Sequence, residues 1–136
     1  MYELLTDLIE SLKDDNIGDW IIDTDSRGRI DEPTTAPYVS YSNIAKDLIL
    51  KVYEFSDMHP EYELKKYRDV LSRYGLDWKS ESMKKADVSS LDGKAVMALL
   101  MSIIRMDRFC EGAVLGFCKD GYVLKWLKRL KELDDE

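Results

Sequence analysis

The sequence predicts a mainly α-helical fold, a single domain over residues 1–136 with five or six helices and a small β-hairpin near residues 19–41. Apolar residues recur every three or four positions through most of the chain, which is the spacing of one helix face. A nearly continuous apolar run, residues 91–104, is typical of a central buried helix. Only the stretch between residues 15 and 41 breaks the helical spacing, and it contains two extended segments. A chain of 136 residues is long enough for one domain with a sizeable core.

The N-terminal third is expected to hold one helix, over residues 2–14, followed by the hairpin. The apolar positions of that helix share one face and are Leu4, Leu5, Leu8, Ile9 and Leu12. In the hairpin, DWII and PYVSY are the strands, and residues 26–28 form the turn. Ser42 is placed to cap the next helix, because its hydroxyl can accept a hydrogen bond from a free backbone N–H group of the first turn.

A third helix is expected over residues 60–74, with Pro60 in its first turn and Gly75 as its stop. Two acid–base pairs spaced four residues apart are expected on its outer face, Glu61/Lys65 and Asp69/Arg73. A polar segment, residues 76–90, then leads to the C-terminal third. We expect Trp78 and Met83 to pin this segment to the body, since a free linker has no need of a tryptophan.

The C-terminal third gives the strongest helical signal. After residues 91–104 the chain continues as helix or kinks near Gly112, and Gly121 begins a break before the last helix, YVLKWLKRLKEL. The cations of that helix are expected to face outward. Cys110 and Cys118 are interpreted as small core residues with free thiols. On a continuous helix they would lie about 12 Å apart along the axis, which is too far for a disulfide.

Charge and hydropathy exclude several classes of partner. The formal net charge is -7, so nucleic acid is not the default partner. Residues 1–32 carry ten acids and three bases, and the remainder is neutral overall. The longest apolar run has about half the length that a membrane span needs. The first ten residues, MYELLTDLIE, do not resemble a secretion signal, so we expect a cytoplasmic protein.

A calcium loop is suggested at first sight by DTDSRGRIDEPT, residues 23–34. Asp23, Asp25 and Asp31 stand at ligand positions of a helix-loop-helix calcium site. However, Arg27 puts a cation where an oxygen ligand is needed, and Thr34 cannot supply the bidentate carboxylate that closes such a site. We interpret the stretch as an acidic turn. One histidine and two cysteines are too few for a zinc site, and no metal or cofactor is expected.

The strongest candidate site is a polar cluster directly after the apolar run, formed by Arg105, Arg108 and Glu111. Steps of three residues would place all three near one helix face. Two arginines there could bind a phosphate or carboxylate through bidentate hydrogen bonds. The competing interpretation is a structural ion-pair network, because Asp107 and Glu111 also bring a carboxylate within reach of each arginine. No catalytic residue is assigned.

The segment I-I-R-x-x-R-F-C-E-G, residues 103–112, also carries a family resemblance. With the later D-G step and the final leucine- and lysine-rich helix, it resembles small bacterial proteins catalogued only as a domain of unknown function. The resemblance covers residues 60–133. It implies a compact, mostly helical cytoplasmic protein, and it implies no activity.

Two functions from different classes remain open. The first is a non-enzymatic protein-interaction or regulatory module, whose acidic N-terminal third and basic last helix could face a partner protein or a second copy in a homodimer. The alternative is a binder of an anionic small molecule, or an enzyme acting on one, with Arg105 and Arg108 as a clamp and Glu111 as acid or base. A third hypothesis, ranked last, is that residues 1–32 imitate nucleic-acid phosphate.

Overall fold

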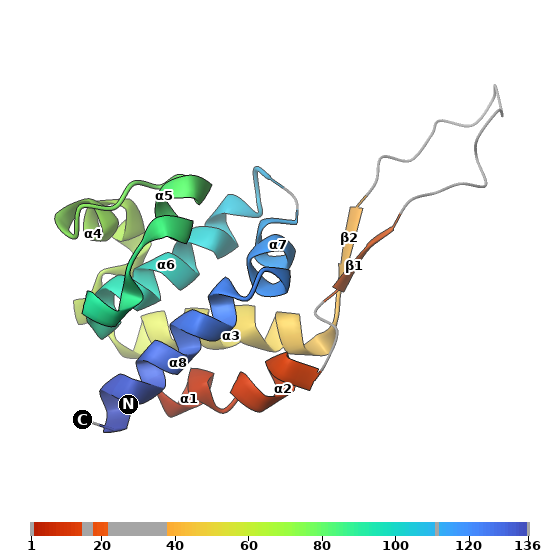
Figure 1. The fold of residues 1–136 in the computed structure, drawn as a ribbon, viewed down its shortest axis with the longest axis horizontal. Helices are drawn as coiled ribbons and strands as arrows, with labels where there is room; N and C mark the ends of the chain where they lie inside the picture. Colours follow the sequence, from red (N-terminus) through yellow and green to blue (C-terminus); the bar gives the residue numbers. More distant parts are fainter. Residues whose placement is uncertain (1, 15–17, 22–37, 111, 136) are drawn as a thin grey trace, which may run out of the picture.

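The computed structural model describes residues 2–14, 18–21, 38–110 and 112–135, which form a helical body with a two-stranded hairpin (Figure 1). In chain order the elements are α1 (Glu3–Thr6), α2 (Ile9–Asp14), β1 (Gly18–Ile21), β2 (Tyr38–Tyr41), α3 (Asn43–Met58), the 3-10 turns η1 (Pro60–Tyr62) and η2 (Leu64–Lys66), α4 (Tyr67–Arg73), α5 (Ser80–Lys85), the 3-10 turn η3 (Val88–Ser90), α6 (Gly93–Met106), α7 (Ala113–Lys119) and α8 (Tyr122–Asp135). The predicted fold, mainly α-helical with a hairpin, is confirmed.

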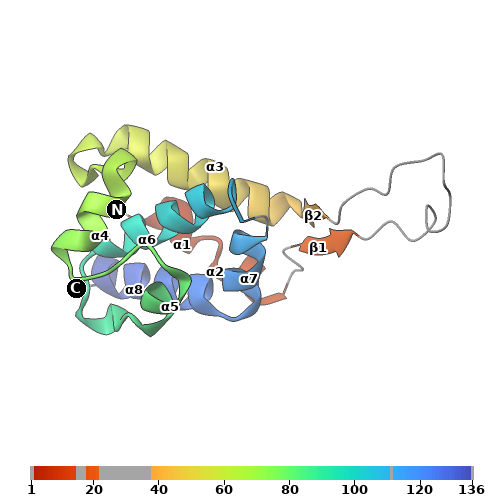
Figure 2. The same ribbon diagram turned by 90° about the horizontal axis from the view of Figure 1, so that it is seen from above.

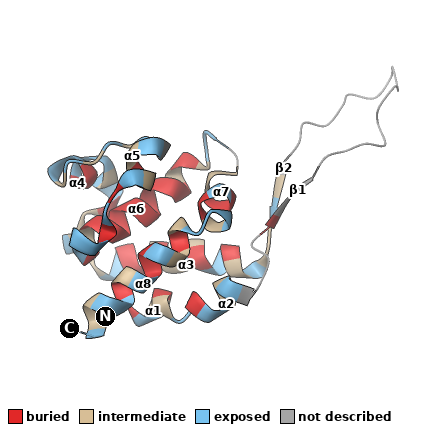
Figure 3. Cartoon of the chain, viewed as in Figure 1, coloured by how far each residue is buried: buried red, intermediate tan, exposed pale blue. Residues whose placement is uncertain are grey.

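Helix α6 forms the centre of the body. All of its residues except Lys94 and Arg105 are buried, and its ribbon is red over most of its length in Figure 3. It packs against α3, α4, α7 and α8. Its start is fixed by Asp92, whose carboxylate accepts a hydrogen bond from the backbone N–H of Ala95 at 3.1 Å. The apolar run in the sequence therefore predicts the central helix correctly.

Helix α8 closes the body against the N-terminal helices. It packs on α1, α2, α6 and α7 through an apolar face of Val123, Trp126, Leu127 and Leu130. The backbone N–H of Tyr2 donates a 2.8 Å hydrogen bond to Oδ2 of Asp134, so the two ends of the chain lie side by side, as both ribbon views show (Figures 1 and 2). Lys125, Lys128 and Lys131 are exposed on the outer face, as expected. Arg129, which was also expected to face outward, is half-buried because its Nε donates a 3.1 Å hydrogen bond to the carbonyl of Leu91.

The hairpin strands pair in antiparallel register, with Gly18 opposite Tyr41 and Ile21 opposite Tyr38. In both ribbon views the strands lead away from the helical body, beginning near α2 and the start of α3 (Figures 1 and 2). Their base is anchored, because Tyr41 packs on the hydrophobic core. The predicted turn at residues 26–28 lies outside the described part of the chain.

Two predicted helices and the polar segment at residues 76–90 differ in detail from the prediction. The helix expected over 2–14 is two short helices with a turn at residues 7–8, and both parts bury apolar residues, Leu5 in α1 and Ile9 in α2. The helix expected over 60–74 begins as two 3-10 turns separated by Glu63, whose left-handed backbone interrupts the helix. The polar segment contains α5, and Met83 buries fully there, as predicted.

Candidate functional site

Arg105 lies in the last turn of α6 and is half-buried. Its guanidinium carbon is 5.7 Å from the centroid of the Tyr53 ring on α3, within the range of a cation–π contact. The Nε atom is buried and has no hydrogen-bond partner among the described residues. The positive charge of Arg105 near the C-terminus of α6 interacts favourably with the helix dipole.

Arg108 lies in the turn that follows α6 and is exposed. Its backbone N–H donates to the carbonyl of Arg105 at 3.2 Å, but its side chain forms no ion pair with a described residue. Because α6 ends at Met106, the continuous helix face expected to carry the candidate cluster ends before Arg108. Glu111 lies outside the described residues, so the cluster of three remains a prediction.

Asp107 does not pair with either arginine. Its Oδ2 atom accepts a 2.5 Å hydrogen bond from the hydroxyl of Tyr41 and a 2.9 Å bond from the backbone N–H of Val114. The Tyr41 hydroxyl also accepts from the N–H of Leu115 at 3.2 Å. These bonds satisfy backbone donors at the start of α7, which Gly112 enters with a left-handed backbone. Burial and the bond to Asp107 raise the pKa of Tyr41.

A second site is a hydrophobic surface between the end of α6 and the α4–α5 connection. We call it the Trp78–Phe109 surface; it consists of Arg68, Trp78, Met106, Phe109 and Cys110 and encloses a hollow of about 400 Å³. Phe109 is 78 % exposed, and its ring meets that of Trp78 edge to face with centroids 6.5 Å apart. Contiguous exposed apolar patches mark interaction sites, and Phe109 extends the apolar area formed by Trp78 and Met106.

The Trp78–Phe109 surface is fixed in place before any ligand binds. The indole N–H of Trp78 donates a 3.3 Å hydrogen bond to the carbonyl of Ser102 in α6. On the indole face, the guanidinium carbon of Arg68 lies 3.8 Å from the ring centroid. Tyr67 meets the same ring edge to face at 5.9 Å. This packing orients Arg68 with its donors available at the edge of the hollow.

The rim of this surface is basic, although the chain is acidic. A neighbouring hollow of about 250 Å³ shares Met106 and Cys110 with it and adds Lys84. Arg68 and Lys84 thus line one continuous apolar area, and Lys84 lies 3.6 Å from the carboxylate of Asp120. Arg108 directly precedes Phe109 in the chain and is exposed. Helices α1 and α2, which carry Glu3 and Glu10, lie at the opposite side of the body (Figure 1).

The two thiols have different environments. Cys110 is exposed on the Trp78–Phe109 surface, so its interpretation as a core residue is wrong; it lies in the turn after α6 and not on a buried helix face. Cys118 is half-buried, and burial raises the pKa of its thiol to about 12. A thiol with such a pKa is a poor nucleophile at neutral pH.

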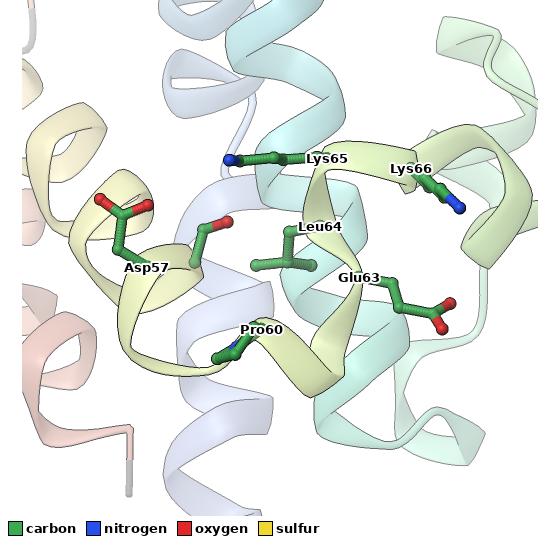
Figure 4. Close-up of a pocket in the computed structure, with 7 residues that line it drawn as sticks. Asp57, Pro60, Glu63, Leu64, Lys65 and Lys66 are labelled. Atoms are coloured by element: carbon green, nitrogen blue, oxygen red, sulfur yellow. The ribbon is translucent and has the colours of Figure 1, made fainter.

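Of the further hollows on the described surface, two are lined by both acidic and basic residues. One, of about 300 Å³, lies between the end of α3 and the two 3-10 turns that follow it (Figure 4). The other, of about 340 Å³, runs along α8 beside η3, where the lysines 125 and 128 and Arg129 face Asp87 and Glu132. In this second hollow Nη1 of Arg129 is 3.3 Å from Oε2 of Glu132.

In the described part of the chain, no three His, Cys, Asp or Glu side chains are grouped so that they could hold a metal ion. The calcium-like stretch at 23–34 lies outside it. None of the described helices combines the length and the apolar character that a membrane span requires.

Sequence reasoning missed the Trp78–Phe109 surface: it expected Trp78 to pin the polar segment, interpreted Cys110 as core and made no prediction for Phe109. The signal was present in RMDRFCEG, where three charged residues within four positions follow the buried run and indicate that the helix is leaving the core. A single apolar residue inside such a polar segment has no helical stripe to join. Phe109 is that residue.

Comparison with known proteins gives one match. No curated protein and no solved structure matches the chain. A family model described as "Family of unknown function (DUF6508)" matches residues 3–136. This range includes the hairpin region as well as residues 60–133, which carry the family resemblance in the sequence. The chain belongs to this family of unknown function.

Proposed function

We propose that the chain is a non-enzymatic protein-interaction module that binds its partner through the Trp78–Phe109 surface. The observation that supports this most is Phe109, a large apolar side chain that is 78 % exposed on a pre-packed aromatic base. Burying a phenylalanine fully contributes about 1.5–3 kcal/mol, so this side chain alone can anchor an interface. Aromatic and arginine side chains dominate the binding energy of protein interfaces.

The partner we propose is a protein segment that places an apolar side chain in the hollow and carries carboxylates around it. Arg68 and Lys84 line the surface and can bind carboxylates, Arg68 through two parallel hydrogen bonds. The exposed Arg108, next to Phe109 in the chain, adds a third positive charge. Because Arg68 is already held on Trp78, it loses little side-chain freedom on binding. Nucleic acid is the less favoured polyanion, since the whole chain carries a formal charge of -7.

The alternative function, binding of an anionic small molecule by Arg105, Arg108 and Glu111, has less support. Arg105 is half-buried against Tyr53 and lines none of the hollows in the described part of the chain. Arg108 is exposed, but it directly precedes Phe109 in the chain. It would therefore contact the partner of the Trp78–Phe109 surface rather than a separate small molecule. The cytoplasmic location is a proposal as well, supported by two cysteines that are free.

Photo-crosslinking tests the proposed surface. A crosslinking amino acid replaces Phe109 in one variant and Leu50, which is 65 % exposed on α3, in the control. In the cells that produce the chain, position 109 is expected to yield a protein adduct that position 50 does not, mapping to an acidic segment of the partner. Arg68→Glu is expected to abolish it. Equal adducts at both positions, adducts only with a second copy, or adducts only with nucleic acid would each overturn the proposal.

A further inference from the structure

The hollow at the end of α3 has the features of a small-molecule site, and it is separate from the Trp78–Phe109 surface. It measures about 300 Å³ and is lined by Ser56, Asp57, Pro60, Glu63, Leu64, Lys65 and Lys66. Leu64 is buried and forms its apolar floor, with Pro60 at one rim (Figure 4). A volume of this size is at the lower end of known ligand pockets and suits a ligand of amino-acid size.

The loop that forms the hollow is locked in an unusual conformation. Glu63 has a φ of 55°, a left-handed value that a residue with a side chain adopts only at a cost. Its carboxylate is held by Nη1 of Arg73 in α4 at 2.7 Å and by Nζ of Lys94 in α6 at 3.8 Å. These cations lower the pKa of Glu63. The turn that carries Leu64 and Lys65 is therefore fixed to two helices of the body.

Three polar groups around the hollow remain unused. Within the described residues, neither Asp57 nor Lys65 forms an ion pair, and the hydroxyl of Ser56 makes no hydrogen bond. In Figure 4 the Lys65 side chain extends over the hollow toward the end of α3 that carries Asp57, while Lys66 and the Glu63 carboxylate point away. One carboxylate, one ammonium and one hydroxyl thus border a single apolar floor.

We propose that this hollow binds a free α-amino acid with an apolar side chain. The ligand's ammonium group would contact Asp57, its carboxylate would contact Lys65 and the Ser56 hydroxyl, and its side chain would lie on Leu64. A plain anion would be repelled by Asp57, and a plain cation by Lys65, whereas a zwitterion satisfies both charges.

Titration followed by two-dimensional NMR of the whole chain tests this site. Each of the amino-acid types found in proteins is added as the free compound at up to about 10 mM. This concentration is high enough to measure dissociation constants in the millimolar range. For the best ligand, resonances of residues 56–66 are expected to shift. The analogues that lack its ammonium or its carboxylate are expected to bind at least about tenfold more weakly. Absence of shifts with every amino acid, or equal binding of either analogue, overturns the proposal.

Substitutions of exposed residues distinguish binding in this hollow from non-specific binding to the protein surface. Lys65→Ala and Asp57→Asn are each expected to weaken binding about tenfold or more, because each removes one of the two charge contacts. Lys66→Ala is the matched control, since its side chain points away from the hollow, and it should leave the affinity unchanged (Figure 4). An equal loss in Lys66→Ala and Lys65→Ala would contradict the assigned geometry. None of these variants touches the Trp78–Phe109 surface, so the two proposals fail independently.

Discussion

Tyr41 and Asp107 join the hairpin to the helical body. The phenol at the end of β2 donates to the carboxylate in the turn after α6, and both groups also bind backbone N–H groups at the start of α7. Two segments far apart in the sequence, the end of β2 and residues 107–115, therefore meet at one pair of side chains. Asp107, whose carboxylate was expected to lie within reach of Arg105 or Arg108, bonds to Tyr41 instead.

Tyr41→Phe is expected to destabilise the fold by about 1–3 kcal/mol, because it removes one donor to the partly buried Asp107 carboxylate and the acceptor of the Leu115 N–H. Urea unfolding followed by circular dichroism measures the loss. The matched control is Tyr122→Phe, because the Tyr122 ring packs on Phe117 while its hydroxyl makes no hydrogen bond with described residues. Equal stability of the Tyr41 variant and wild type would show that the bond contributes nothing.

Gly93 allows Tyr2 to pack on the start of α6. A Cβ atom at this position would lie 1.6 Å from the Tyr2 hydroxyl and 2.4 Å from the ring carbon that bears it. We expect Gly93→Ala to displace the buried Tyr2 ring and cost about 1–3 kcal/mol in the free energy of unfolding, as overpacking does elsewhere. A urea titration of the variant beside wild type checks this value.

Gly116→Ala is the control for Gly93→Ala, and the opposite effect on stability is expected. Gly116 lies in α7, and a Cβ atom there would have open space around it. The substitution is expected to stabilise the protein by about 0.5–1 kcal/mol, because alanine has the higher helix propensity. If both alanine variants changed stability in the same direction, the clash with Tyr2 would not be the cause of the Gly93 effect.

Stability is expected to fall at alkaline pH. Burial raises the pKa of Tyr2, Tyr41 and Tyr62 above the ordinary value, and burial with the bonds to Asp92 raises that of Tyr74 to about 12. A raised pKa means that the unfolded chain releases its proton first. The contribution of these tyrosines to the free energy of unfolding is therefore complete below about pH 10. It is lost as the pH rises through their pKa values in the folded protein.

Urea unfolding at a series of pH values, followed by circular dichroism, measures this decline. The slope between about pH 10 and 12 should be smaller in Tyr41→Phe, which removes one of the shifted groups. Stability that stayed constant over this range would contradict the assignment of raised tyrosine pKa values.

The sequence predicted the parts of the fold that depend on local rules. The buried helix follows from its apolar run, and Ser42 caps α3 as expected, with its hydroxyl accepting from Ala45 at 3.5 Å. The stop at Gly75 is also correct, since its φ is 74° and glycine adopts that value without strain. These features need only neighbouring residues, so a pattern in the sequence contains them.

The parts that failed depend on contacts between distant residues. Arg73 was expected to pair with Asp69 one turn away, but its described partner is Glu63, which a left-handed backbone brings within 2.7 Å. Nothing in the local sequence announces that backbone. The exposure of Phe109 was missed for a similar reason, because it depends on where α6 leaves the core rather than on the residue itself.

Arg105 and Arg108 are expected to differ in their contribution to stability. Arg105→Ala should cost about 1 kcal/mol, since it removes a half-buried side chain that packs on Tyr53. Arg108→Ala should change the free energy of unfolding by less than about 0.5 kcal/mol, because the side chain is exposed. Urea unfolding measures both. A loss of several kcal/mol in Arg108→Ala would instead place it in a structural ion-pair network.

The central claim is that Phe109 is held at the surface for a partner and not for the fold. The measurement that tests it most directly is the free energy of unfolding of Phe109→Ala, with Phe117→Ala as control because Phe117 is only 3 % exposed. The account predicts a change within about 0.5 kcal/mol for Phe109 and a loss of about 3–5 kcal/mol for Phe117. A loss of several kcal/mol in Phe109→Ala would show that the side chain supports the fold, and would contradict the account.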